Sequence, residues 1–344
     1  MLRLPGRTPQ KEGARLQRLR LYPGFTRSIV LAAGLAATSP VIGQSARGYP
    51  VKPIHVVSGF PPGGVNDSVA RMVSTKLAEN LSTAVVVDNR PGAAGTLAAA
   101  MVAKAEPNGY TLLVYSSGFA INAAIQETLP YDPRKDFVGV AQIGPNTQAL
   151  IVAPSLGVKS VAELVALAKA QPGKIVLGSS GAGSGSHLIG ETVRLLAGIS
   201  VVHVGFKGNA DLMLQIAGGR VHYGISALGP AMPLVKDGKL AVLAVTSPQR
   251  SPLMPDVPAL AESLPGFRYR GGFGLLAPAR TPRNVVNLLN REVGRILEQP
   301  DVRERLVNMG VVPAPASAEQ FDTWVREEIE YFSKVVRDIG MRKP

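Results

Sequence analysis

The chain has 344 residues, no cysteine and a formal net charge of +13. Its length exceeds the roughly 150 residues of a usual domain, so we expect two domains with ample core. The lack of cysteine excludes a disulfide framework and thiolate chemistry. The four histidines, His55, His187, His203 and His222, do not have a spacing typical of zinc ligands, so neither metal nor cofactor is expected.

Residues 1–46 differ from the rest of the chain. They contain seven basic residues and one acidic residue, with an apolar run at 29–37. A basic segment, a short apolar run and small residues are typical of a secretory signal peptide, with Gly43, Ser45 and Ala46 as candidate cleavage sites. A disordered tail and an uncleaved anchor are the alternatives. Export would remove six of the thirteen net positive charges, and the dispersed remainder favours anionic small ligands over nucleic acid.

The first strand is predicted at residues 54–58, followed by a glycine loop and a helix with apolar residues at helical spacing. Asn66 or Asp67 is expected to cap this helix, and we expect Asp67 to organise the loop rather than act as a catalytic acid. The free N–H groups of the first helical turn, with those of Gly63 and Gly64, favour a carboxylate or another anion beyond the strand. An ordinary turn without ligand is the alternative, so a second site facing the first is needed.

The same strand–loop–helix unit then recurs. A strand at 84–87 leads through a glycine loop at 89–95 to a helix at 96–104, and a strand at 110–115 ends in Ser116-Ser117-Gly118. Strands that alternate with helices predict an α/β fold with mostly parallel sheets. Ligands in such folds bind beyond the carboxyl ends of the strands.

The pattern restarts after residue 150 and predicts a second α/β domain. Helices are expected at 161–170, 187–197 and 210–217, and strands at 175–177, 201–204, 222–226 and 241–245. The segment 269–276 is interpreted as a crossing back, and the helices at 282–297, 302–309 and 318–339 as packing on the first domain. The predicted domains are therefore 49–150 with 272–344, and 151–271, joined by hinge segments. Trp324 is expected to be a packing residue.

The stretch GSSGAGSGSH at 178–187 invites an enzymatic interpretation. It lacks the lysine of a P-loop, the last glycine of a dinucleotide fingerprint and the flanking glycines of a nucleophile elbow. His187 follows Ser184 by three residues, but a catalytic triad is a spatial arrangement that spacing does not show. What remains is a second set of hydroxyls and N–H groups at a helix N-terminus, which is the counterpart that the first loop requires.

With these elements in place, the sequence resembles the substrate receptors of tripartite tricarboxylate transporters, the Bug family of exported bacterial solute-binding proteins. The resemblance covers about residues 49 to 340 in one collinear order. The matching stretches include GFPPGGVNDSVAR at 59–71, VVDNRPGAAGT at 86–96, NGYTLLVYSS at 108–117, GSSGAGSGSHLIGE at 178–191 and HVGFKGNADL at 203–212.

The resemblance implies a two-domain periplasmic-binding-protein fold of type II, a flytrap that closes on a small organic carboxylate, amide or aromatic acid and delivers it to membrane transporter subunits. The protein is expected to be a periplasmic monomer and not an enzyme. Carried onto this chain, the implied ligand-binding residues are Phe60, Pro61, Pro62, Gly63, Gly64, Asp67, Ala93, Ala94, Gly95, Ser116, Ser117, Asn122, Ser179, Ser180, Ser184 and His187, with Lys207 and Ser226 as weaker candidates.

The chain departs from the family pattern in the second domain. Gly205-Phe206 replaces a frequent Pro-Tyr pair, and Ser226 stands where Asp is common, which makes an amino-acid ligand less expected. Thr96 replaces a frequent Asn. Two other functions stay open: an exported serine-dependent hydrolase or transferase, and a ligand-sensing subunit for a membrane signalling partner. The sequence does not identify the ligand, because backbone donors recognise any carboxylate.

Overall fold

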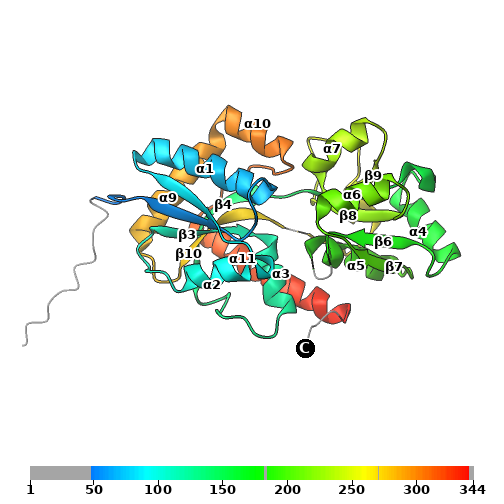
Figure 1. Ribbon diagram of the computed structural model, residues 1–344, viewed down its shortest axis with the longest axis horizontal. Helices are drawn as coiled ribbons and strands as arrows, with labels where there is room; N and C mark the ends of the chain where they lie inside the picture. Colours follow the sequence, from blue (N-terminus) through cyan, green and yellow to red (C-terminus); the bar gives the residue numbers. More distant parts are fainter. Residues whose placement is uncertain (1–47, 182–183, 270, 341–344) are drawn as a thin grey trace, which may run out of the picture. The chain divides into compact units, whose positions relative to one another are not determined.

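A computed structural model describes residues 48–181, 184–269 and 271–340. The predicted signal peptide at 1–46 lies outside these residues. The strands of the described part form two five-stranded sheets (Figure 1). Each sheet, with the helices that cover it, is called a lobe below. No helix in the described ranges combines the length and the hydropathy needed to cross a bilayer.

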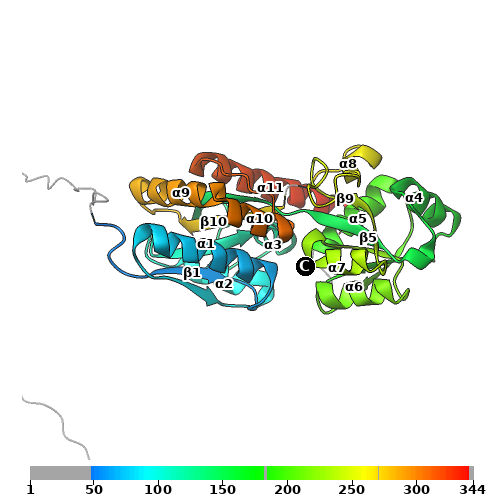
Figure 2. The same cartoon turned by 90° about the horizontal axis from the view of Figure 1, so that it is seen from above.

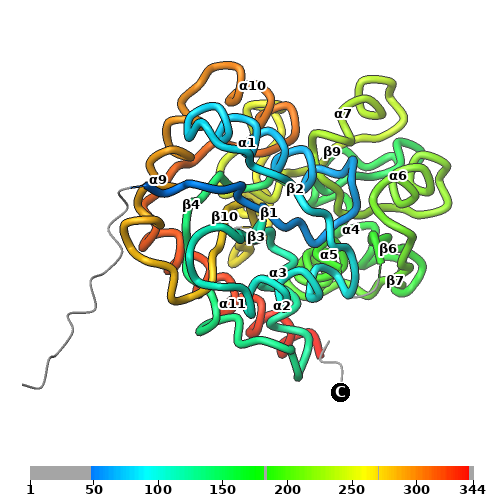
Figure 3. Tube along the Cα trace, turned by 60° about the vertical axis from the view of Figure 1, so that its left-hand side comes forward, coloured from blue at the N-terminus to red at the C-terminus, as the bar shows by residue number. Residues whose placement is uncertain are grey.

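The sheet of the first lobe has the strand order β2-β1-β3-β10-β4. Its strands β1, β2 and β3 are parallel, and β10 is antiparallel to both of its neighbours. Figure 3 shows β1 between β2 and β3. The bounds are Ile54–Ser58 (β1), Val85–Asn89 (β2), Thr111–Ser116 (β3), Phe137–Pro145 (β4) and Gly272–Pro278 (β10).

Two of these strands were not predicted. The sequence analysis predicted no element at β4. It is an edge strand that ends at Pro145, and edge strands are where sheets tolerate proline. The glycine-rich β10 was interpreted as a crossing segment. A Cβ added to Gly274 would lie 2.2 Å from the Phe321 ring, so this strand needs glycine for packing rather than for a turn.

Helices cover both faces of the first sheet (Figures 1 and 2). Ile54 and Val56 face one apolar cluster with α1, α9 and α10, and Val57 faces the other cluster with α2, α3 and α11, as expected for the two-residue period of a strand. The bounds are Val65–Leu81 (α1), Thr96–Ala103 (α2), Ser117–Ile125 (α3), Arg283–Glu298 (α9), Pro300–Asn308 (α10) and Ala318–Asp338 (α11).

The sheet of the second lobe has the order β7-β6-β8-β5-β9. Here β6, β7 and β8 are parallel, and β5 is antiparallel to β8 and β9. The two sheets therefore have corresponding strand orders, with one reversed strand in each. The bounds are Gln148–Val152 (β5), Val176–Ser179 (β6), Val202–Gly205 (β7), Tyr223–Ala227 (β8) and Ala241–Val245 (β9).

Residues of α6 and α7 join an apolar cluster of the second lobe, and those of α4, α5 and α8 join the cluster that also contains Val57 and residues of α2, α3 and α11. Helix α7 was not predicted because it contains Pro230 and Pro233, and proline in a helix interior removes a hydrogen bond. The bounds are Val161–Ala170 (α4), Gly185–Ala197 (α5), Asn209–Ala217 (α6), Leu228–Lys236 (α7) and Leu260–Ser263 (α8), with 3₁₀ turns at Ala93–Gly95 (η1) and Pro154–Leu156 (η2).

The chain crosses between the sheets after β4 and again before β10, and the two crossings are hydrogen-bonded. The Asn146 N–H donates to the Gly271 carbonyl at 2.7 Å. The predicted α/β architecture of two mostly parallel sheets is confirmed. The domain limits given in the sequence analysis stay a prediction.

Candidate ligand-binding site

The candidate residues gather at one edge of each sheet. In the first lobe they follow the carboxyl ends of the parallel strands β1, β2 and β3, and in the second lobe those of β6, β7 and β8. These are corresponding positions in the two strand orders. Because carboxyl ends of parallel strands meet at a common edge, each lobe offers one set of loops to a ligand.

A buried carboxylate holds the first loop. Asp67 accepts hydrogen bonds from the Gly63 N–H at 3.0 Å, from Arg71 Nε at 2.9 Å and from Asn89 Nδ2 at 2.9 Å. Burial acts to raise the pKa of Asp67, but the hydrogen bonds from Arg71, Gly63 and Asn89 hold it below its usual value. The carboxylate is therefore ionised and fully used in positioning the loop, as predicted.

The predicted helix cap is wrong. Helix α1 begins at Val65, so the N-cap is Gly64, and Asn66 and Asp67 lie inside the first turn. Asp67 instead bonds backward to Gly63, which is four residues upstream and outside the helix. Residues 61–64 are exposed, but the Gly63 N–H that was predicted to face an anion is engaged by Asp67.

Sequence reasoning missed Asn89 and Arg71. Asn89 Nδ2 donates also to the Phe60 carbonyl at 3.0 Å, and its Oδ1 accepts from Arg71 at 3.0 Å. Two signals could have found them: Asn89 ends a strand parallel to β1, and Arg71 stands four residues after Asp67, where helical side chains meet.

The second loop has an unusual backbone. Gly92, Ala93, Ala94 and Gly95 all have positive φ, at 139°, 45°, 54° and 95°. For alanine the left-handed region costs about 1–2 kcal/mol per residue, and such strain is found at binding sites. Both alanines are exposed, and no hydrogen bond between described residues uses their N–H groups. Asn122 Nδ2 fixes the turn by donating to the Ala94 carbonyl at 2.8 Å.

The three strand ends of the first lobe are brought together. A Cβ added to Gly59 would lie 2.6 Å from Gly95 Cα, so the first and second loops touch through their backbones. The Phe60 ring lies against Gly95 and Gly118. Between these loops, Ser116, Asn122 and Tyr131 help to line a cavity of about 20 Å³, which is room for about one water molecule.

The serines of the second lobe form one network. Ser186 accepts from the Ser180 N–H at 2.9 Å, and its hydroxyl lies 2.9 Å from Ser180 Oγ and 3.0 Å from Ser184 Oγ. Ser184 caps α5 by accepting from the His187 N–H at 3.3 Å. Ser186 was not among the predicted site residues, although it connects them.

Two imidazoles adjoin these serines. The His187 and His203 rings stack with centroids 3.6 Å apart, and His203 Nε2 lies 2.7 Å from Ser179 Oγ. Burial, and then the neighbouring His203, lower the pKa of His187 to about 4, against an opposing effect of Glu191. Burial also lowers the pKa of His203. His203 was missed as a site residue because its contact depends on the pairing of β6 with β7.

Lys207 and Ser226 are not part of the serine network. The Lys207 side chain is exposed, and its N–H donates to Asp211 at 3.4 Å, which repeats the Gly63–Asp67 bond of the first lobe. Ser226 is buried, and its hydroxyl has no hydrogen-bond partner among the described residues. Neither side chain makes a described hydrogen bond to the serine network.

Contacts also join residues of the two lobes near the candidate site. Tyr269 OH donates to Ser117 Oγ at 3.4 Å. Ile121 Cδ1 would lie 3.3 Å from a Cβ added to Gly185. The first turn of α5 is therefore within van der Waals reach of α3.

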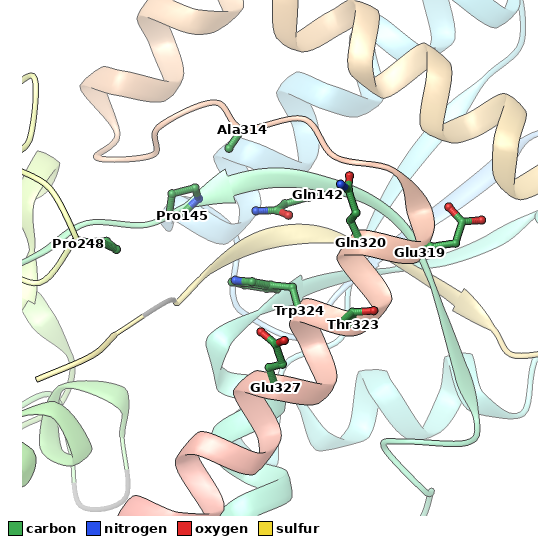
Figure 4. A pocket seen from close by; sticks show the side chains of 9 residues that line it. All are labelled: Gln142, Pro145, Pro248, Ala314, Glu319, Gln320, Thr323, Trp324 and Glu327. Carbon is green, nitrogen blue, oxygen red and sulfur yellow. The ribbon is translucent and has the colours of Figure 1, made fainter. Parts of the chain in front are cut away.

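Larger cavities include two that are lined in part by residues of α11. One, of about 550 Å³, is lined by Trp324 with Gln142, Gln320, Glu327 and prolines of both lobes (Figure 4). The other, of about 740 Å³, is lined by Tyr269, Tyr331 and neighbouring residues. Trp324 also stacks on Phe321, which agrees with its predicted packing role. Within the described ranges, no group of three or more His, Asp or Glu side chains could hold a metal ion.

The comparison with protein families decides the identity of the chain. Residues 69–341 match the model described as the tripartite tricarboxylate transporter family receptor. The chain belongs to this family. The resemblance predicted from the sequence is thereby confirmed.

Relatives of this receptor family cover nearly its whole length. A UPF0065 protein of Bordetella bronchiseptica is 35% identical over 94% of this chain and 96% of its own. BugT of Bordetella pertussis is 33% identical over 91% of this chain and 95% of its own.

Solved structures of similar receptors include two with a bound acid. A protein of R. palustris with adipate has a TM-score of 0.76 and 33% identity, covering 85% of this chain and 98% of that one. MatC from Rhodopseudomonas palustris with bound malate has a TM-score of 0.72 and 31% identity, covering 84% and 100%. The periplasmic binding protein BugD has a TM-score of 0.74 and 28% identity, covering 86% and 100%.

Proposed function

We propose that this receptor captures a small organic carboxylate between the loops of its two lobes and delivers it to a tripartite tricarboxylate-type transporter. The observation that carries the proposal is the first-lobe edge, where Ala93 and Ala94 are exposed and their N–H groups make no hydrogen bond to another described residue. Their loop contacts the loop that leads into α1 through Gly95, which lies against Gly59 and Phe60. Neutral donors and a helix N-terminus stabilise a carboxylate without a buried counter-cation.

The acids named in the solved relatives support this ligand class, since adipate and malate are both carboxylates. The cavity of about 20 Å³ at the strand ends is too small for such an acid. We therefore place the ligand on the exposed faces of the loops, with the second-lobe serines as the opposite wall.

Capture by closure follows from the two-lobed architecture. The predicted domains, 49–150 with 272–344 and 151–271, would rotate about the crossings near Asn146 and Gly271. A ligand that contacts both lobes binds the closed state better than the open one, and it shifts the population toward closure by that difference in affinity. We further propose that the protein is exported to the periplasm and acts there as a monomer, without a cofactor.

A hydrolase is the less supported alternative. The serine that contacts an imidazole is Ser179, which is fully buried and has its hydroxyl engaged with Gly181 and His203. Ser184 is the helix cap and contacts Ser186. Neither arrangement resembles an exposed nucleophile next to its base. Turnover of an ester or amide that is lost in Ser184→Ala would restore the enzymatic interpretation.

Thermal-shift screening of the purified protein against mono-, di- and tricarboxylic and aromatic acids tests the proposal. An acid present at 100 times its Kd stabilises the folded protein by about 2.7 kcal/mol, which raises Tm by several degrees. The matching alcohols and amides serve as controls. Absence of any acid-dependent shift would contradict carboxylate binding, and loss of solute uptake on deletion separates a transport receptor from a sensor.

A further inference from the structure

The stacked imidazoles in the second lobe have a defined hydrogen-bond polarity. Ser179 Oγ donates to the Gly181 carbonyl at 3.0 Å and accepts from the Gly181 N–H at 3.3 Å. Because its one proton is used, the arrangement that satisfies these contacts of Ser179 has His203 Nε2–H donating to it. The Nδ1 atom of His203 is then the nitrogen that gains a proton, and protonation leaves the Ser179 bond intact.

The stack accepts at most one proton. Two imidazolium ions with centroids 3.6 Å apart would repel strongly, so the second protonation is suppressed. Near neutral pH both rings are uncharged, since the pKa of His187 is about 4 and that of His203 is also lowered.

The charges around the stack leave it responsive to an anion. Glu191 acts on both rings from the next turn of α5, and it is paired with Arg194 at 2.7 Å. Tyr223 on β8 is buried near Glu191. Helix α5 also packs against β6, α3 and α11. The first two carry no ionisable side chain, and the charges of α11 are not among those acting on either ring.

The stack also lies on the side of the second lobe that meets the first. His187 is in the first turn of α5, two residues after Gly185, which lies against Ile121 of α3. Its ring is only partly buried. A dicarboxylate held by one end in the first-lobe loops would thus present its other end to this turn.

We propose that the His187–His203 stack recognises a second acidic group of the ligand and takes up one proton when a dicarboxylate binds. This inference rests on the proposed function. A carboxylate next to the rings favours their charged form, so the proton that the free protein rejects is retained in the complex. Between the free and bound pKa values, affinity for a dicarboxylate then rises up to tenfold for each unit by which pH falls. A monocarboxylate lacks this dependence.

Calorimetric titration at pH 6, in two buffers of different ionisation enthalpy, measures the proton uptake. The probes are adipate and malate, with hexanoate as the monocarboxylate. The baseline is the variant His187→Phe/His203→Gln, which keeps a ring to stack and an amide to bond Ser179, and it reports the protons carried by the ligands themselves. We expect about half a proton or more above this baseline for the preferred dicarboxylate, and none for hexanoate.

An NMR titration of the imidazoles in the wild-type protein keeps the test valid if the variant fails to fold. Four histidines give few signals to assign, and the pKa of one ring of the stack should rise when the dicarboxylate is present. Dicarboxylate binding without proton uptake or pKa change overturns the inference, as does binding of monocarboxylates alone, and both leave the proposed function standing. Failure of every acid to bind overturns the proposed function and this inference together.

Discussion

The two lobes build their strand-end loops from different parts of the chain. In the first lobe the exposed groups belong to the backbone, at 61–64 and 92–95, and the side chains of Asp67, Asn89 and Asn122 work underneath to hold them. In the second lobe the corresponding groups are the part-buried hydroxyls of Ser180 and Ser184, joined through Ser186 next to two imidazoles. Backbone N–H groups donate to any carboxylate, whereas hydroxyls and imidazoles differ in which groups they can donate to or accept from. We infer that the first lobe supplies affinity and the second supplies selectivity.

The largest effect is expected from Asp67→Ala, which breaks the support of the first lobe. The change leaves the Gly63 N–H and the Asn89 amide without their acceptor, so we expect a loss of about 2–3 kcal/mol in unfolding free energy and roughly 100-fold in affinity. Denaturant unfolding and calorimetry measure the two quantities. Asp211→Ala is the matched control, because its bond to the Lys207 N–H is longer and lies in a more exposed place, and it should cost less than about 0.5 kcal/mol.

The same carboxylate predicts a pH dependence of stability. Since the pKa of Asp67 is lower in the folded protein than in the unfolded chain, its stabilising contribution is present above the unfolded value of about 4 and is lost as pH falls through the folded value. The difference in stability between wild type and Asp67→Ala should therefore shrink below about pH 4. A difference that stays constant to lower pH would contradict the assigned ionisation.

Gly64→Val tests whether ligands approach the first-lobe backbone. Gly64 has a φ of −83°, and a Cβ there would meet only the Pro61 carbonyl, at 4.0 Å. The protein should thus fold normally, with affinity for its carboxylate about 30-fold lower because the side chain occupies the approach. Gly294→Val in α9, where no atom lies within 4 Å of an added Cβ, is the control. Equal affinities of the two variants by calorimetry would remove Gly64 from the site.

The smallest effect on affinity is expected from Ser186→Ala, which sharpens the role of the second lobe. It removes the acceptor of the Ser180 N–H and should destabilise the protein by about 1–2 kcal/mol. Affinity should fall about fivefold, but unequally for different acids, so the ranking of ligands in the thermal-shift screen changes. A uniform loss for all acids would mean that the second lobe contributes affinity and not selectivity.

The sequence predicted more of the candidate site than of its support. Strand ends with glycine or serine after them are visible as local patterns, so Gly63, Ala94, Ser116 and Ser180 could be placed at the correct edges. The hydrogen-bond network through Asn89 could not be predicted in this way, because it depends on the parallel pairing of β1 with β2. The contact of His203 with Ser179 likewise needs the register of β6 and β7.

Some features contradict the usual preferences of their residues and were therefore invisible. Left-handed backbone at Ala93 and Ala94 is the opposite of what alanine favours. Helix α7 forms despite two prolines, since tertiary packing of Leu228 and Ala231 outweighs propensity. The cap of α1 was assigned to the wrong residue. Asp67 lies in the first turn of the helix and accepts from the Gly63 N–H, and the local sequence does not distinguish this position from that of an N-cap.

Trp324 gives the protein a built-in optical reporter. It is the one tryptophan of the chain, and its ring lies in a cavity bounded by Pro145 before one crossing and Pro248 of the other lobe (Figure 4). Any rotation about the crossings changes the solvent around the indole, and indole emission depends on that surrounding. Opening and closing can therefore be followed by intrinsic fluorescence in the unmodified protein. Each acid is added in turn, and the change in indole emission reports whether it closes the lobes.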